Sequence, residues 1–183
     1  YSEDLEKIEK ELFSLNKIGY NCEYVKDLNL PVSNVGGIKF SSQAQFHPLK
    51  FIKSIVKNLK IYENTFVKDV KDNVAITDKY KIKADKIIIA SHFPFINRHG
   101  SYFLKQYQHR SYVISLKGVQ NINEMYVDES DTGLSLRSYG DFLLLGGGGH
   151  RTGKQGGCWQ ELENFAKKYY PQAKIVGRWA TQD

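Results

Sequence analysis

The 183-residue chain has the composition of an ordinary globular protein, with 41% hydrophobic, 13% aromatic and 25% charged residues. Its 26 basic and 20 acidic residues give a net charge of +6, but the lysines are spread along the chain, which argues against a nucleic-acid binder. The longest apolar runs are far too short to cross a bilayer and no secretory leader is visible, so we expect a cytoplasmic protein without a membrane span.

An amphipathic helix is the first expected element. Ser2 can cap it, apolar residues from Leu5 onward follow helical spacing, and Gly19 stops it. Short strands are expected at residues 23–25 and 37–40. Cys22 lies in this region, far from Cys158, and neither cysteine has a metal-ligand partner at a suitable spacing. The sequence therefore predicts no disulfide framework and no metal site.

A second helix is predicted from Pro48 to residue 59, with its apolar residues facing inward and a lysine stripe facing solvent. His47 before it suits a helix start better than a catalytic role. Four short strand signals follow at residues 61–62, 65–70, 74–77 and 80–83, with turn residues at Asp72-Asn73 and Asp78-Lys79. They predict a tight β-meander.

The isoleucine-rich segment at residues 85–94 is predicted to be a buried strand. Three consecutive isoleucines without polar alternation suit a strand covered on both faces, and the small residues Ala90 and Ser91 allow another group to approach its end. Open α/β sheets bind ligands at such strand ends. An ordinary core strand is the alternative interpretation.

The last third of the chain is predicted to form an antiparallel sheet. Residues 109–116 alternate, with Tyr112 and Ile114 on one side of the strand, and further strands are expected at 125–128, 134–138, 141–145 and 175–179. A helix is expected from Cys158 to about residue 170, ended by Pro171.

A run of four glycines at residues 146–149 is the most unusual motif. It fits neither a phosphate loop nor a dinucleotide-binding fingerprint, and it indicates either close approach of the backbone to a ligand or a flexible bulge at a strand end. His150 directly after it is the best candidate for a polar group aimed into a pocket. Arg137 could clamp a carboxylate or form a structural ion pair, and Tyr112 could face a ligand or the core.

Six short segments, taken in order, resemble the glycine oxidase/D-amino acid oxidase (DAO) family of FAD-dependent oxidoreductases. They are residues 43–48, 63–67, 86–95, 135–137, 143–152 and 178–183. The resemblance implies an α+β fold, in which a large mixed, mainly antiparallel sheet with flanking helices is the substrate-binding part. The small β-meander would belong to the FAD-binding domain. Residues 1–45 and 101–183 would then be substrate-domain segments and residues 46–100 an FAD-domain segment.

The resemblance also implies site residues. Val67 would lie against the adenine end of FAD, and Ala90, Ser91 and His92 near its phosphate-ribose side, with Trp179 also touching the cofactor. His150 would face the substrate side of the flavin, with Arg137 and Tyr112 as neighbours. The reaction implied is hydride transfer to flavin from the carbon beside an amine.

The glycine-rich fingerprint and the flavin loop of the DAO family are absent from this sequence. We therefore expect a fragment that is inactive alone, taken from an enzyme that oxidises an amine or amino acid. A Rieske domain or an electron-acceptor protein is the expected partner in the full-length chain. The alternative is a stand-alone module that binds a small anion or assists assembly without catalysis.

Overall fold

The computed structural model describes residues 1–96, 100–130 and 133–182. The chain divides into two compact units: unit 1 comprises residues 1–42 and 107–183, and unit 2 comprises residues 43–106. We expected breaks after residues 45 and 100, whereas the units meet at residues 42/43 and 106/107. Both units combine helices with antiparallel sheet.

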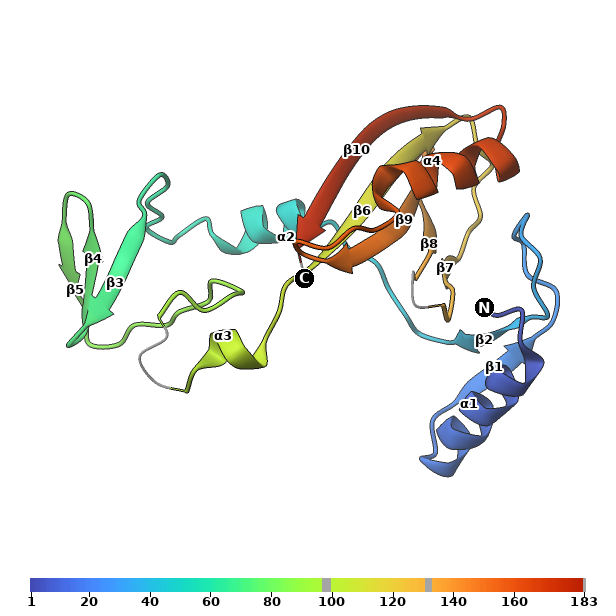
Figure 1. The fold of residues 1–183 in the computed structure, drawn as a ribbon, viewed down its shortest axis with the longest axis horizontal. Helices are drawn as coiled ribbons and strands as arrows, with labels where there is room; N and C mark the ends of the chain where they lie inside the picture. The colour runs from blue at the N-terminus through green and yellow to red at the C-terminus, as the bar shows by residue number, and fades with distance from the viewer. Residues whose placement is uncertain (97–99, 131–132, 183) are drawn as a thin grey trace. The chain divides into compact units, whose positions relative to one another are not determined.

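Unit 1 is built on an antiparallel sheet of five strands in the order β10-β6-β9-β8-β7 (Figure 1). A register shift between Ile175 and Gly177 interrupts the pairing of β10, an edge strand, with β6. The strands are β6 (His109–Lys117), β7 (Met125–Val127), β8 (Ser135–Tyr139), β9 (Phe142–Arg151) and β10 (Lys174–Gln182).

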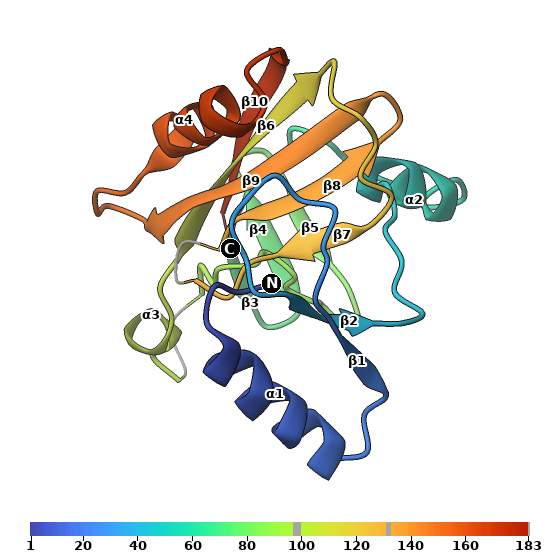
Figure 2. The ribbon, with the colours of Figure 1, turned by 90° about the vertical axis from the view of Figure 1, so that its right-hand side faces the viewer.

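The core of unit 1 lies between this sheet and helix α4 (Cys158–Tyr169), which packs against β6 and β9 (Figure 2). Alternate side chains on each strand point to the same face, so the buried residues of β6 recur at every second position, as predicted. Each of six core side chains is at most 1% exposed: Ile114, Leu116, Leu136, Leu143, Leu145 and Leu162. Burial of these aliphatic groups fixes the register of the sheet.

The N-terminal part of unit 1 contains helix α1 (Leu5–Lys17) and the antiparallel pair of β1 (Cys22–Val25) and β2 (Gly37–Phe40). The predicted cap, Ser2, is wrong, because the Asp4 carboxylate accepts hydrogen bonds from the N–H groups of Glu6 and Lys7. Ser2 is instead buried and forms an isolated β-bridge with Gly36.

Unit 2 contains the predicted meander, formed by β3 (Val67–Lys71), β4 (Val74–Thr77) and β5 (Lys81–Lys83). Asp72 and Asn73 both have positive φ in the turn between β3 and β4, which is the conformation that short hairpins favour. Residues 61–62 do not form a strand. The unit also contains α2 (Pro48–Ile55) and α3 (Tyr102–Lys105). His47 caps α2, as predicted, and accepts a hydrogen bond from the Lys50 N–H.

Two burial predictions in unit 2 are wrong. The predicted buried strand around residues 85–94 has no strand pairing, and the Ile88 side chain is 90% exposed. Helix α2 ends at Ile55 and buries none of its residues. Both predictions assumed a second layer of structure over the apolar side chains, and within unit 2 the described helices and strands provide no such layer.

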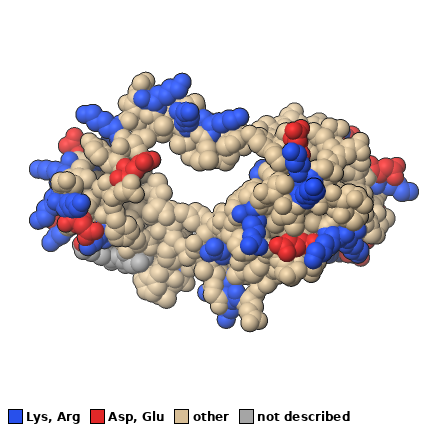
Figure 3. Space-filling view, turned by 90° about the horizontal axis from the view of Figure 1, so that it is seen from above, with Lys and Arg blue, Asp and Glu red and all other residues tan. Residues whose placement is uncertain are grey.

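On the face of the molecule shown in Figure 3, Lys and Arg side chains are interspersed with acidic and uncharged groups. None of the described helices has the length and apolar character needed to span a bilayer. A cytoplasmic location stays a prediction.

Replacing Leu145 by Ala should lower the free energy of unfolding of unit 1 by about 2–5 kcal/mol, because it leaves a cavity in a closed core. Replacing Ile88 by Ala should change stability by less than about 0.5 kcal/mol, because its side chain contacts water. Urea unfolding followed by circular dichroism measures both. A loss at Ile88 as large as that at Leu145 would support the buried strand that the sequence predicted.

Candidate functional site

Three side chains that can exchange protons converge at one end of the sheet in unit 1. The Tyr112 hydroxyl on β6 lies 2.9 Å from His150 Nε2 on β9. The Cys158 Sγ, at the first residue of α4, lies 3.6 Å from the same nitrogen. We call these three residues the Tyr-His-Cys cluster. The sequence analysis named Tyr112 and His150 as site residues, and the structure brings them together.

The imidazole of His150 is held by both of its nitrogens. Its Nδ1 lies 3.0 Å from the backbone oxygen of Arg151, and a carbonyl can only accept a hydrogen bond. In the neutral ring, Nδ1 therefore carries the proton, and Nε2 presents a lone pair to the Tyr112 hydroxyl and the Cys158 thiol. This is the arrangement of a base held by a third group.

Tyr112 is the buried member of the cluster, with 6% of its surface exposed. Its ring stacks on His150 and meets Trp159 edge to face, with centroids 5.6 Å and 4.9 Å away. The hydrogen bond with Cys158, followed by burial, raises the pKa of Tyr112, while the nearby Arg110 acts in the opposite direction. The phenol is therefore a neutral hydrogen-bond donor at neutral pH.

The glycine run explains how Cys158 comes so close to the sheet. Residues 146–149 lie inside β9 rather than after it, and a register shift opposite β6 makes this part of the strand bulge. Gly148 has φ +61°, and a Cβ there would lie 2.3 Å from the backbone oxygen of Cys158. The group that approaches the glycine backbone is thus the start of α4.

Cys158 is the site residue that the sequence analysis missed. The spacing of Cys158 from other residues predicts neither a disulfide nor a metal site, but Cys158 follows Gly156-Gly157 and opens a predicted helix eight residues after His150. A thiol at a helix start close to a histidine is a recognised arrangement for a reactive cysteine. That spacing was the available signal.

Arg137 and Trp179 do not join the cluster. Arg137 pairs with Leu144, whereas its neighbour Leu136 is in the core, so Arg137 points to the face of the sheet away from α4. Trp179 pairs with Val113 on that same outer face and is 44% exposed. The geometry of the cluster supports neither predicted role of Arg137, the binding of a substrate carboxylate or a structural ion pair.

The four predicted cofactor residues of unit 2 lie in two different parts of that unit. Val67 begins β3, while Ala90, Ser91 and His92 lie exposed in a segment without regular structure. The Ser91 hydroxyl donates to the backbone oxygen of Phe93. The predicted flavin cavity would need residues of both units, because Val67 and Ser91 belong to unit 2 and His150 belongs to unit 1.

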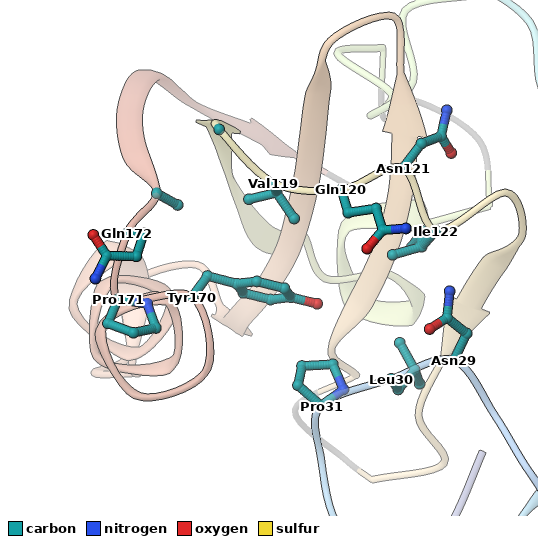
Figure 4. Close-up of a pocket in the computed structure, with 12 residues that line it drawn as sticks. Asn29, Leu30, Pro31, Val119, Gln120, Asn121, Ile122, Tyr170, Pro171 and Gln172 are labelled. Atoms are coloured by element: carbon teal, nitrogen blue, oxygen red, sulfur yellow. The ribbon is translucent and has the colours of Figure 1, made fainter.

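A pocket of about 440 Å³ lies in unit 1, between the loops that follow β1, β6 and α4 (Figure 4). Tyr170 extends across it, and its buried hydroxyl has no hydrogen-bond partner among the described residues. None of the lining side chains is charged, which favours an uncharged ligand. The lining residues are Asn29, Leu30, Pro31, Gly118, Val119, Gln120, Asn121, Ile122, Tyr170, Pro171, Gln172 and Ala173.

The chain is similar in sequence to a bacterial protein that is named for an iron–sulfur cluster. The sequence is 29% identical over 196 residues to the "Putative Rieske 2Fe-2S iron-sulfur protein YhfW" of Bacillus subtilis (strain 168). The match covers 98% of this chain but only 38% of the relative, so the chain spans well under half of that protein's length. No family model matches the sequence, and no solved structure matches it.

These comparisons correct the assignment to the DAO family. The relative is named for an iron–sulfur cluster rather than for flavin or amine oxidation. The predictions of DAO membership, of FAD as cofactor and of an amine or amino-acid oxidoreductase are therefore wrong. The amine substrate is likewise unsupported. The physical reason is that the resemblance depended on the order of several short segments, one of which is the segment with the exposed Ile88.

The described residues do not fit a Rieske cluster either. In such a centre, two cysteines bind one iron and two histidines the other. The chain has two cysteines, Cys22 in β1 and Cys158 in α4, and both are free. Within residues 1–96, 100–130 and 133–182, no group of three or more His, Cys, Asp or Glu side chains is placed to hold a metal.

Replacing Tyr170 by Phe should leave the protein equally stable or more stable by about 1 kcal/mol. The substitution removes a buried hydroxyl that makes no hydrogen bond with the described residues, and such groups destabilise the folded state. Burial also raises the pKa of this phenol. Urea unfolding followed by tryptophan fluorescence measures the change in unit 1. A loss of more than 1 kcal/mol would mean that the hydroxyl has a partner.

Replacing Gly148 by Ala should destabilise unit 1 by roughly 3 kcal/mol, from left-handed backbone strain and from collision of the new Cβ with Cys158. Gly140→Ala is the matched control. Gly140 has φ +55° and open space around its Cβ position, so it should show only the strain of about 1–2 kcal/mol. Equal losses in the two variants would show that α4 does not pack on the glycine backbone.

Proposed function

We propose that this chain is a part of an iron–sulfur electron-transfer protein that does not itself bind the cluster. One observation carries the proposal. The sequence matches a relative named as a Rieske 2Fe-2S protein along 98% of its own length, while its described residues lack a set of cluster ligands. A cluster in such a protein would be supplied from outside these 183 residues.

The proportions of the match support this division of roles. More than half of the relative's length has no counterpart in this chain. A set of two cysteines and two histidines in that remainder would account for the relative's name without any ligand from the matched part.

Within such a protein, we assign to unit 1 the binding of an uncharged small molecule. The pocket beside Tyr170 offers amide groups from Asn29, Gln120, Asn121 and Gln172 along with apolar side chains, and no charge. A neutral ligand would lose little hydration energy on entering it, whereas an ion would enter without a counter-charge.

Anaerobic reconstitution with iron and sulfide tests the proposal. The 183-residue chain should retain well under one iron per molecule after desalting and should give no Rieske-type electron paramagnetic resonance signal when reduced. The double variant Cys22→Ser, Cys158→Ser is the matched control and should retain the same amount of iron. Two irons per chain, together with a Rieske signal that the double variant loses, would overturn the proposal.

A further inference from the structure

We propose that Cys158 is a reactive thiol, activated by His150, which exchanges with low-molecular-weight disulfides. This inference does not depend on the electron-transfer proposal, because the step requires no iron. It concerns the Tyr-His-Cys cluster in unit 1 and treats Cys158 as the nucleophile, His150 as the base and Tyr112 as a hydrogen-bond donor.

The nucleophile and the base are in contact. Cys158 Sγ lies 3.6 Å from His150 Nε2, a distance at which a thiol can donate a hydrogen bond to nitrogen. Since the backbone oxygen of Arg151 keeps the proton of the neutral ring on Nδ1, Nε2 carries a lone pair that both the Tyr112 hydroxyl and the Cys158 thiol face, and it can receive the thiol proton when the hydroxyl turns away. A thiolate beside an imidazolium is the reactive form of cysteine.

Tyr112 can stabilise the thiolate after the proton has moved. Its hydroxyl donates to Nε2 in the resting arrangement, at 2.9 Å. Once Nε2 is protonated it no longer accepts, and the hydroxyl can turn toward the sulfur, with which it already interacts. The buried phenol thus supplies a hydrogen bond to the anion.

Charged groups around the cluster come from two elements. On β6, Arg110 lies beside Tyr112. On β9, Arg151 follows His150 in the sequence, but its guanidinium lies over the Tyr107 ring. On α4, the start of the helix favours an anion at Cys158, whereas the Glu161 carboxylate, folded back toward Gly157, disfavours it. One cation and a helix start therefore oppose one carboxylate.

Thiol–disulfide exchange balances without any other reactant. The Cys158 sulfur attacks one sulfur of the disulfide, and a new S–S bond forms as the old one breaks. The second sulfur leaves with the electron pair as a thiolate and takes a proton from the His150 imidazolium. Cys158 is oxidised to a mixed disulfide, and the leaving sulfur is reduced. Cys158 is only partly buried, so a small disulfide can approach it.

Cys22 provides an internal comparison. It is also a free, partly buried thiol, but it lies on β1 opposite Phe40, and among the described residues it makes no hydrogen bond with a histidine. Cys22→Ser leaves only Cys158, and Cys158→Ser leaves only Cys22. The two single-cysteine proteins share one fold and differ in the surroundings of the remaining thiol.

The test is the rate at which each protein reacts with the aromatic disulfide DTNB from pH 6 to pH 9. We expect Cys22→Ser to react at least about fivefold faster than Cys158→Ser at pH 7, because the proton of the remaining Cys158 thiol can pass to His150. Its rate should also fall less steeply between pH 9 and pH 6. Adding His150→Gln should remove most of this advantage and restore the steeper pH profile.

His109→Gln is the matched control for loss of a histidine. His109 lies at the same end of the sheet, against Gly149, and pairs with Arg151. Adding His109→Gln to the Cys22→Ser protein should change its rate of reaction with DTNB by less than twofold. If His150→Gln fails to fold, the comparison of the two single-cysteine proteins still decides the matter. Equal rates and parallel pH profiles for Cys22 and Cys158 would overturn the proposal, as would an unchanged rate in a folded His150→Gln variant.

Discussion

The close approach of helix α4 to strand β9 determines the arrangement of unit 1. A side chain at Gly148 would collide with the backbone of Cys158, and one at Gly147 would collide with Leu134. Glycine at these positions lets the helix start lie directly on the strand, and Leu162 then closes the core over Leu143 and Leu145. The same contact places the Cys158 thiol beside His150. Core packing and site geometry therefore share one cause.

Local signals in the sequence predicted the elements of unit 1 well. The alternation around Tyr112 and Ile114 predicted β6 with these two residues on one face, which is the buried one, and the helix at Cys158 was predicted within one residue of its end. Unit 2 was predicted less well. Its meander follows from turn residues such as Asn73, but the burial of Ile88 and of α2 required a covering layer, which periodicity cannot reveal.

The candidate site was predictable in its parts and not in its chemistry. His150 was selected as a polar residue after a glycine run and Tyr112 as a residue on an alternating strand, and they meet because β6 and β9 are neighbours. Arg137 was selected on equally reasonable grounds, but strand register turns it to the opposite face. Pairing partners are set by long-range contacts, so the sequence alone could not separate these cases. The family resemblance failed for a related reason, since short segments in a plausible order carry little information about a cofactor.

The bulge in β10 has a consequence for how the protein behaves at high concentration. An edge strand of nine residues could serve as a template on which another chain pairs, beginning a fibril. In β10, the register shift between Ile175 and Gly177 interrupts the straight hydrogen-bonding ladder. Copies of the chain that meet at this edge would mismatch in hydrogen-bond register. The irregularity thus opposes amyloid-like growth along β10.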